Sequence, residues 1–344
     1  MNRKKRKISF FNILESFLFI TGFFFASHYL TQKAGTDLYL SANAAMTGGS
    51  SPVSFNIDYP SLALIRIPTH PIKEDLSSSE TYVPENKEAE TAEPIPDAPV
   101  LQNTSADKPL VTNDSGYEIN TDELLSEPVY LREGDIKVLI VHTHTSEAYI
   151  EQFSESDSYR SEDDSKNVIA VGDVIENVLN ENGIGVIHDK TYHDYPSYSG
   201  AYRRSMDTVN ANLEKYPSIT FVLDIHRDAI SDGAGGYLKT LAEIDGQKCA
   251  QGLIVIGTDA DGLTHPMWCE NLKYGLRLQK IMCEKYPGFA RPLHLRSERF
   301  NGHLREGAMI LEIGSNANTL EEAKTAALYM GDCLTALINS LEIR

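Results

Sequence analysis

The stretch from Val138 to Tyr149, which reads VLIVHTHTSEAY, constrains the fold of this chain more than any other. It begins as an apolar run of branched side chains, which is typical of a buried strand. The run then changes abruptly to histidine, threonine, serine and glutamate. Such a strand delivers ligand-type side chains to the rim of a sheet, and open α/β sheets bind their ligands at the carboxyl ends of strands.

Two later strands end in the same way. Residues 221–228 read FVLDIHRD and carry His226, and residues 309–314 read MILEIG and carry Glu312 as a lone carboxylate in an apolar setting. Three strand ends would therefore bring histidine and glutamate side chains together. These are the side chains that a catalytic zinc site needs.

Strand and helix signals alternate from Gly134 to the C-terminus. Strands are predicted over residues 137–144, 184–188, 219–228, 293–299 and 308–313, and an antiparallel pair over 236–245 and 251–258 around the Asp245-Gly246 turn. Helices are predicted over residues 167–182, 200–216, 266–286 and 319–341. This order predicts an α/β domain over residues 134–344, with a mixed, mostly parallel sheet and helices on both faces.

The N-terminus carries a membrane signal. Residues 1–7, MNRKKRK, are strongly basic, and residues 8–30 are apolar over a length that can cross a bilayer, which takes roughly 20 residues. The basic tail predicts a cytoplasmic N-terminus, a single-pass transmembrane anchor and an extracytoplasmic remainder. A cleaved signal peptide is the alternative, because Ala42-Asn43-Ala44 resembles a cleavage site.

Residues 31–133 are predicted to form an acidic, proline-rich linker. The part from 68 to 120 is rich in Pro, Ser, Thr, Asp and Glu and poor in aromatic residues. Such a composition buries too little apolar surface to offset the loss of chain entropy on folding. We expect an extended tether between the anchor and the α/β domain.

Charge and cysteine content exclude some functions. The formal net charge is −18 at pH 7, which argues against a non-specific nucleic-acid binder, because such a protein needs a basic surface. The four cysteines form no CxxC pair. We expect them to be small apolar core residues, and one disulfide remains open.

The first strand end offers two candidate metal ligands, His142 and His144. They are two residues apart, and strand periodicity places such residues on the same side. His144 and Glu147 also have the HxxE spacing seen in zinc carboxypeptidases. Glu147 is therefore one candidate for a further ligand, and Asp163, in the acidic run 162–164, is another.

The second strand end supplies His226 as a metal ligand, because neutral imidazole suits zinc. Asp224 precedes it by two residues and is expected to accept a hydrogen bond that fixes the imidazole tautomer. Arg227 and Asp228 either bind the substrate or pair with each other.

The third strand end supplies the candidate catalytic residue, Glu312. Burial raises the pKa of a carboxylic acid, and a raised pKa suits a general base that acts on metal-bound water. Asn316, which follows this strand, is a candidate for substrate binding.

The motifs HTHTSEAY, DIHRDA and LEIGSNANTLEEA resemble the stage II sporulation protein P family of endospore-forming Firmicutes, over roughly Lys137 to the C-terminus. The chain is similar, more distantly, to zinc-dependent N-acetylmuramoyl-L-alanine amidases. Their last motif, Glu-x-Gly followed by Ser-Asn and a helix, matches Glu312, Gly314, Ser315 and Asn316.

The resemblance implies a peptidoglycan hydrolase at the septal membrane during engulfment of the forespore. It would cleave the amide between N-acetylmuramic acid and L-alanine, with endopeptidase activity on stem peptides as well. The resemblance leaves open which of His142 and His144 binds metal. Our hypothesis is that His142, His226 and a carboxylate hold Zn²⁺, with Glu312 as the base. The implied partners are stage II sporulation proteins D and M.

Two other functions remain open. The first is a zinc carboxypeptidase-like hydrolase of stem peptides, in which His144 and Glu147 form the HxxE pair. The second is a non-catalytic scaffold that binds the cell wall. Analysis of the digestion products separates all three, because only an amidase frees intact peptides from glycan.

Overall fold

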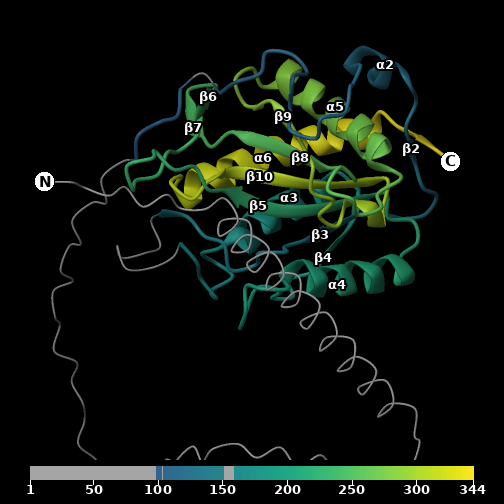
Figure 1. Cartoon of the computed structure of the whole chain (residues 1–344), viewed down its shortest axis with the longest axis horizontal. Coiled ribbons are helices and arrows are strands. Elements are labelled where there is room, and N and C mark those ends of the chain that lie inside the picture. The colour runs from purple at the N-terminus through teal and green to yellow at the C-terminus, as the bar shows by residue number, and fades with distance from the viewer. Residues whose placement is uncertain (1–97, 103, 151–158) are drawn as a thin grey trace, which may run out of the picture. The chain divides into compact units, whose positions relative to one another are not determined.

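A seven-stranded sheet forms the centre of the folded part (Figure 1). The computed structural model describes residues 98–102, 104–150 and 159–344. The strand order is β1-β9-β8-β10-β5-β3-β4, and all neighbouring strands are parallel except β10 and β8. The predicted α/β fold with a mixed, mostly parallel sheet is confirmed.

The elements follow one another in a largely alternating order. The strands of the sheet are β1 (Val111–Asn113), β3 (Ile136–Val141), β4 (Gly185–His188), β5 (Phe221–Asp228), β8 (Gly252–Gly257), β9 (Leu293–Arg296) and β10 (Gly307–Ser315). The helices are α2 (Thr121–Ser126), α3 (Val168–Glu181), α4 (Ala201–Lys215), α5 (Trp268–Lys285) and α6 (Leu320–Asn339), with a 3₁₀ turn at Gly302–Leu304. Two small sheets pair β2 (Tyr130–Leu131) with β11 (Glu342–Ile343), and β6 (Ala242–Ile244) with β7 (Gln247–Cys249).

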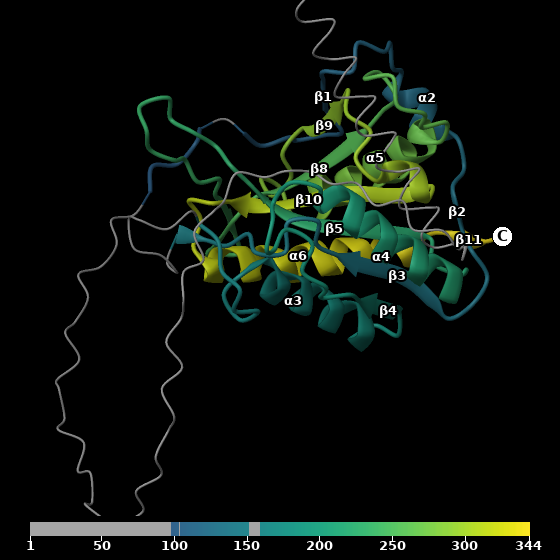
Figure 2. The ribbon, with the colours of Figure 1, turned by 60° about the horizontal axis from the view of Figure 1, so that its bottom comes forward.

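The two faces of the sheet are covered differently. We call the first face the one on which α3, α5 and α6 pack; β10 contributes Met309, Leu311 and Ile313 to it. Helices α3 and α6 pack side by side on this face, and Figure 2 shows both in the lower half of the view. We call the opposite side the second face. It is covered by α4 over β3 and β5, and by Phe300 over β8 and β10. Because strand side chains alternate, Glu312 lies on this second face.

Local signals explain where two helices begin. Asn167 caps α3 by accepting a hydrogen bond from the backbone N–H of Ile169. Thr319 and Glu322 form a capping box at the start of α6. The predicted helices over 167–182 and 319–341 are therefore confirmed to within two residues at each end.

The predicted antiparallel pairing of residues 236–245 with 251–258 is wrong. Asp245 and Gly246 do form a tight turn, with φ angles of 52° and 79°, but it joins only the short strands β6 and β7. Residues 252–257 form β8 inside the main sheet, between β9 and β10. The reason is burial: every residue of β8 is buried, which needs a strand covered on both faces and paired at both edges.

The folded part begins earlier than Gly134. β1 pairs in parallel with β9, and Ala106, which is only 2% exposed, packs into the core. The predicted linker over 31–133 is therefore wrong for the described residues between 98 and 133. The prediction fails because a few apolar residues in this polar stretch pack into the core and allow β1 to pair with β9.

The rest of the predicted linker and the predicted anchor over 8–30 lie outside the described residues. Within the described ranges, no helix is both long and apolar enough to cross a bilayer. The four cysteines are free thiols, and three of them, Cys249, Cys283 and Cys333, are buried, as expected for core residues.

Candidate active site

His226 and Glu312 lie opposite each other on neighbouring strands. The register of β5 and β10 pairs these two residues, and adjacent strands are about 4.8 Å apart. His226 is 4% exposed, and Glu312 is partly buried with its Oε2 atom inaccessible to solvent. A register shift follows between Glu312 and Ser315, where Gly314 has a φ of +71°. A Cβ there would lie 2.7 Å from that of Ala250, so the irregularity that ends the pairing requires glycine.

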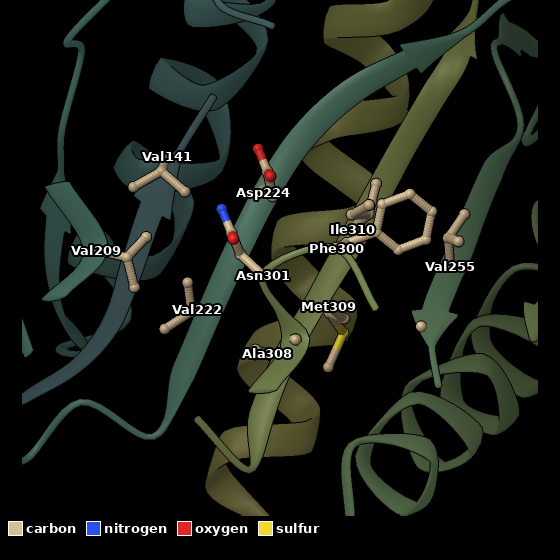
Figure 3. A pocket seen from close by; sticks show the side chains of 12 residues that line it. Val141, Val209, Val222, Asp224, Val255, Phe300, Asn301, Ala308, Met309 and Ile310 are labelled. Atoms are coloured by element: carbon tan, nitrogen blue, oxygen red, sulfur yellow. The ribbon is translucent and has the colours of Figure 1, made fainter. Parts of the chain in front are cut away.

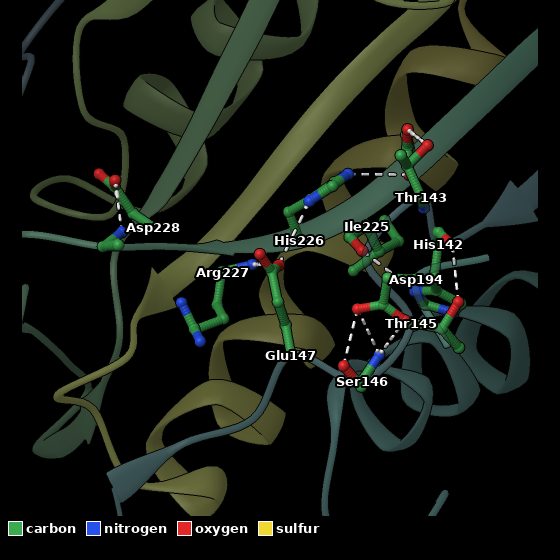
Figure 4. A network of polar contacts seen from close by, with 12 residues as sticks. His142, Thr143, Thr145, Ser146, Glu147, Asp194, Ile225, His226, Arg227 and Asp228 are labelled. Carbon is green, nitrogen blue, oxygen red and sulfur yellow. Dashed lines mark hydrogen bonds and ion pairs between the residues drawn. The ribbon is translucent and has the colours of Figure 1, made fainter. Parts of the chain in front are cut away.

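The imidazole of His226 is held between two carboxylates. Its Nε2 is 3.0 Å from Asp224 Oδ1, and its Nδ1 is 3.2 Å from Glu147 Oε2 (Figure 4). Burial opposes the charged form of His226, but the two carboxylates raise its pKa well above the usual value. Burial likewise opposes ionisation of Glu147 and Asp224, yet the neighbouring His226 lowers the pKa of each to about 2.

His144 reaches the same cluster from the turn that follows β3. Its ring stacks on Tyr198 at 4.4 Å between centroids and meets the ring of His226 edge-on at 5.3 Å. Burial and the neighbouring His226 lower the pKa of His144 to about 4, so the imidazole is neutral at pH 7. Its Nδ1 is buried and has no hydrogen-bond partner among the described residues.

The structure does not bring His142 to this cluster. Its Nδ1 donates to the carbonyl of Ile225 at 3.0 Å, and its Nε2 is 2.8 Å from Nε2 of His188. It lies against α3, since a Cβ on Gly172 would come within 3.0 Å of its ring. The expectation that His142 and His144 share a side fails because β3 ends at Val141 and the chain turns directly after His142.

Two other predicted site residues, Arg227 and Asp228, make contacts within the protein around the cluster. Arg227 donates through Nε to the carbonyl of Ala148 at 2.8 Å, and its backbone N–H donates to Glu147 Oε2 at 3.2 Å, so it holds the loop that carries Glu147. Asp228 forms an ion pair with Arg291 at 2.7 Å and not with Arg227.

Asn316 and Asp163 differ in burial. Asn316 is 2% exposed, its N–H donates to the carbonyl of Asp228 at 2.8 Å, and its buried Oδ1 has no hydrogen-bond partner among the described residues. Asp163 is exposed in a turn, where it accepts from Ser165 and pairs with Lys166 at 3.2 Å. The structure gives Asp163 no contact with the cluster.

Sequence reasoning missed Thr143 and Tyr202. Thr143 donates to both oxygens of Asp224, through its N–H at 2.7 Å and its hydroxyl at 2.6 Å, and so fixes the carboxylate that holds His226. The placement of a threonine between the two histidines was the available signal. Tyr202, on α4, packs edge-on against His144 at 5.5 Å, and no local pattern marks it.

A small apolar pocket opens beside the cluster on the second face. Figure 3 shows Asp224 and Asn301 at one side of it and Val222, Ile310 and Phe300 along its walls. A second pocket is lined by Ser146, Arg160 and Tyr198, the tyrosine that stacks on His144. Both pockets give space next to the polar groups.

The side chains of the cluster are of the types that bind zinc. Their donor atoms do not all lie within 4.8 Å of one another, so His144, His226 and Glu147 would draw closer together around an ion. His144, His226 and Glu147 are donor types that zinc accepts, and three such protein ligands are usual for a catalytic zinc site. The buried Nδ1 of His144 and the buried Oε2 of Glu312 both lack a hydrogen-bond partner among the described residues. A cation with a bound water would satisfy both atoms.

Replacing Glu312 by glutamine should stabilise the metal-free protein at alkaline pH. Burial raises the pKa of Glu312 to about 8, whereas the ordinary value is 4.5. Because the unfolded chain ionises first, native stability falls as pH rises from about 4.5 to about 8. We expect a gain of about 1–3 kcal/mol at pH 8 and little at pH 5, measured by denaturant unfolding with a chelator. An equal gain at both pH values, or a loss at pH 8, would contradict this.

The fold and the cluster define an α/β domain with a histidine–carboxylate site at the carboxyl ends of its central strands. The chain belongs to the stage II sporulation protein P family, whose family model matches residues 59–335. It is 28% identical over 235 residues to stage II sporulation protein P of Bacillus subtilis (strain 168), an alignment that covers 64% of this chain and 56% of the Bacillus protein. The chain thus spans little more than half of the length of that relative.

The chain is also similar to several solved amidases. An N-acetylmuramoyl-L-alanine amidase of Clostridium difficile 630 is 14% identical, with a TM-score of 0.38 over 60% of this chain and 99% of the other. The amidase AmiC2 of Nostoc punctiforme is 11% identical, with a TM-score of 0.35 over 60% and 97%. The CwlD amidase of Clostridioides difficile, solved with the GerS lipoprotein, is 9% identical, with a TM-score of 0.37 over 59% and 96%.

Proposed function

We propose that this chain is a membrane-anchored peptidoglycan hydrolase of sporulation that cleaves the amide between N-acetylmuramic acid and L-alanine. The observation that carries the proposal is the cluster of His144, Glu147 and His226 beside Glu312, at the carboxyl ends of buried strands. Membership of the family supports the sporulation setting.

Zn²⁺ is the cofactor that we propose, held by His144, His226 and Glu147. When bound, it supplies an activated water and polarises the carbonyl of the scissile amide. Asp224 lies 3.0 Å from the second nitrogen of His226 in this structure, where a carboxylate can hold the tautomer of that ligand. Thr143 and Arg227 hold Asp224 and Glu147 in place.

Glu312 is the general base and acid in this proposal. Its pKa of about 8 lies near the working pH, where a group can both take and return a proton. It would take the proton of the attacking water and deliver it to the amine of L-alanine as the amide bond breaks. Its buried Oε2, which has no partner among the described residues, is free to accept that proton.

A second candidate reaction is favoured by one observation. His144 and Glu147 meet His226 with the HxxE spacing of zinc carboxypeptidases, whereas His142 is engaged elsewhere. The same cluster could therefore hydrolyse a bond within the stem peptide, as an endopeptidase or a carboxypeptidase. The chemistry of Glu312 would be unchanged, and only the bond presented to it would differ.

The cellular setting is part of the proposal. The anchor over residues 8–30 would confine the enzyme to the engulfing septal membrane, with its N-terminus in the cytoplasm and the α/β domain outside. Confinement raises the local concentration of enzyme at the wall. Stage II sporulation proteins D and M are the partners that the family resemblance implies.

Product analysis tests the reaction directly. The full-length chain, purified in detergent with zinc, is incubated with isolated peptidoglycan, and the new ends are identified by mass spectrometry. We expect intact stem peptides with a free L-alanine amino group and glycan strands without peptide. Shortened peptides still attached to glycan would support the peptidase. Binding without any new end would support the non-catalytic scaffold and refute both reactions.

A further inference from the structure

A second group of metal-binding side chains lies on the first face of the sheet. Asp173 and Glu176, one helical turn apart on α3, converge with His188 at the end of β4, and one donor atom from each lies within 4.8 Å of the others. His188 Nδ1 is 3.0 Å from Asp173 Oδ1 and 3.2 Å from Glu176 Oε2. None of the three residues belongs to the cluster around His226.

The hydrogen bonds behind His188 fix the orientation of its ring. The Nδ1 of His142 faces the carbonyl of Ile225, which can only accept, so this nitrogen carries the proton. In a neutral ring the Nε2 of His142 is then an acceptor. The Nε2 of His188, 2.8 Å away, donates to it.

The consequence falls on the other nitrogen of His188. This nitrogen, Nδ1, faces the carboxylate oxygens of Asp173 and Glu176 at 3.0 and 3.2 Å. A single imidazole hydrogen can serve only one of the two carboxylates. A cation between the three donor atoms would serve the nitrogen and both carboxylates.

We propose that Asp173, Glu176 and His188 bind a divalent transition-metal ion, with His142 orienting His188 from behind. One imidazole and two carboxylates suit zinc or manganese, and a histidine ligand usually gives its second N–H to an acceptor, here His142. The His188 side chain is 1% exposed, whereas the carboxylates of Asp173 and Glu176 are 37% and 28% exposed, so an ion can enter from solvent.

Lys190 is the competitor for this site. Its Nζ lies 2.6 Å from Asp173 Oδ1, and its side chain is 42% exposed, so it can swing into solvent when an ion binds. Removing its charge should therefore strengthen binding. The bound ion would not take part in the proposed hydrolysis, because its ligands lie on the face opposite to Glu312. It would brace α3 against β4.

Metal stoichiometry tests the proposal. The full-length chain in detergent is stripped with a chelator, titrated with zinc by calorimetry, and analysed for bound zinc after gel filtration. We expect two equivalents in the wild type and one in the double variant Asp173→Asn/Glu176→Gln. Glu181→Gln, an exposed change on the same helix, should keep two. Lys190→Met should bind the second equivalent at least about threefold more tightly.

The outcomes separate this site from the proposed active site. Loss of one equivalent in the double variant, with the other lost in His144→Ala, supports both. If the wild type binds one zinc that only His144→Ala removes, the second site is refuted and the active-site proposal stands. If the double variant keeps two equivalents and a wild-type melting temperature, the second site is equally refuted. Because both carboxylates are partly exposed, we expect the double variant to fold.

Discussion

The variant Glu312→Gln should cleave peptidoglycan about 10³-fold more slowly than the wild type, with its fold and zinc content unchanged. Glutamine keeps the shape of the side chain but cannot take a proton from water, and general acid–base catalysis typically contributes 10²–10⁴-fold. The rate of release of new amino groups from purified peptidoglycan measures the effect. Glu284→Gln, an exposed change on α5, is the matched control and should keep wild-type activity.

The stability of Glu312→Gln distinguishes loss of the general base from loss of the fold. Suppose that glutamine stabilises the metal-free protein at pH 8 and also removes activity. The carboxylate at position 312 then lowers the free energy of unfolding of the wild type but is needed for the reaction. A variant that is inactive because it is misfolded would be less stable at every pH. Retention of more than about a tenth of the wild-type rate would show that Glu312 is not the general base.

Replacing His144 and replacing His142 should have different effects on zinc content and activity. We expect His144→Ala to lose one zinc equivalent and at least about 10²-fold in activity, because it removes a ligand that meets His226. We expect His142→Ala to keep the catalytic zinc and to lose less than about tenfold in activity, because its ring contacts Ile225 and His188 on the first face. Zinc content and the cleavage rate, measured on the same preparations, check both.

The reverse result would restore the hypothesis from the sequence, in which His142 is the metal ligand. If His142→Ala abolished activity and His144→Ala did not, the ring of His142 would have to turn toward His226 in the working enzyme. His142 is fully buried, so its replacement by alanine leaves a cavity that could lower activity by destabilising the fold. Melting curves of both variants show whether the fold is destabilised.

The sequence predicted the parts of the fold that depend on local pattern. The alternation of strands and helices predicted the mostly parallel sheet, and the apolar strands around His226 and Glu312 predicted that both residues lie at strand ends. Neighbouring parallel strands then bring them together without further information. Asp224 was expected beside His226 for the same reason, since residues i and i+2 share a face.

The failures of prediction have non-local causes. His144 leaves the side of His142 because β3 ends at Val141, and strand ends depend on where the neighbouring strands stop. The position of β8 between β9 and β10 depends on burial at both edges and not on the turn at Asp245-Gly246. The docking of β1 on β9 joins segments about 180 residues apart, which no local composition can show.

The uneven covering of the sheet decides how a large substrate can approach. Three helices seal the first face along its length, whereas the second face carries one long helix, α4, and the segment that contains Phe300. A cross-linked polymer cannot thread between packed helices. If the proposed function holds, a wall polymer would therefore lie across the second face, and the enzyme would cut the polymer from one side without enclosing it.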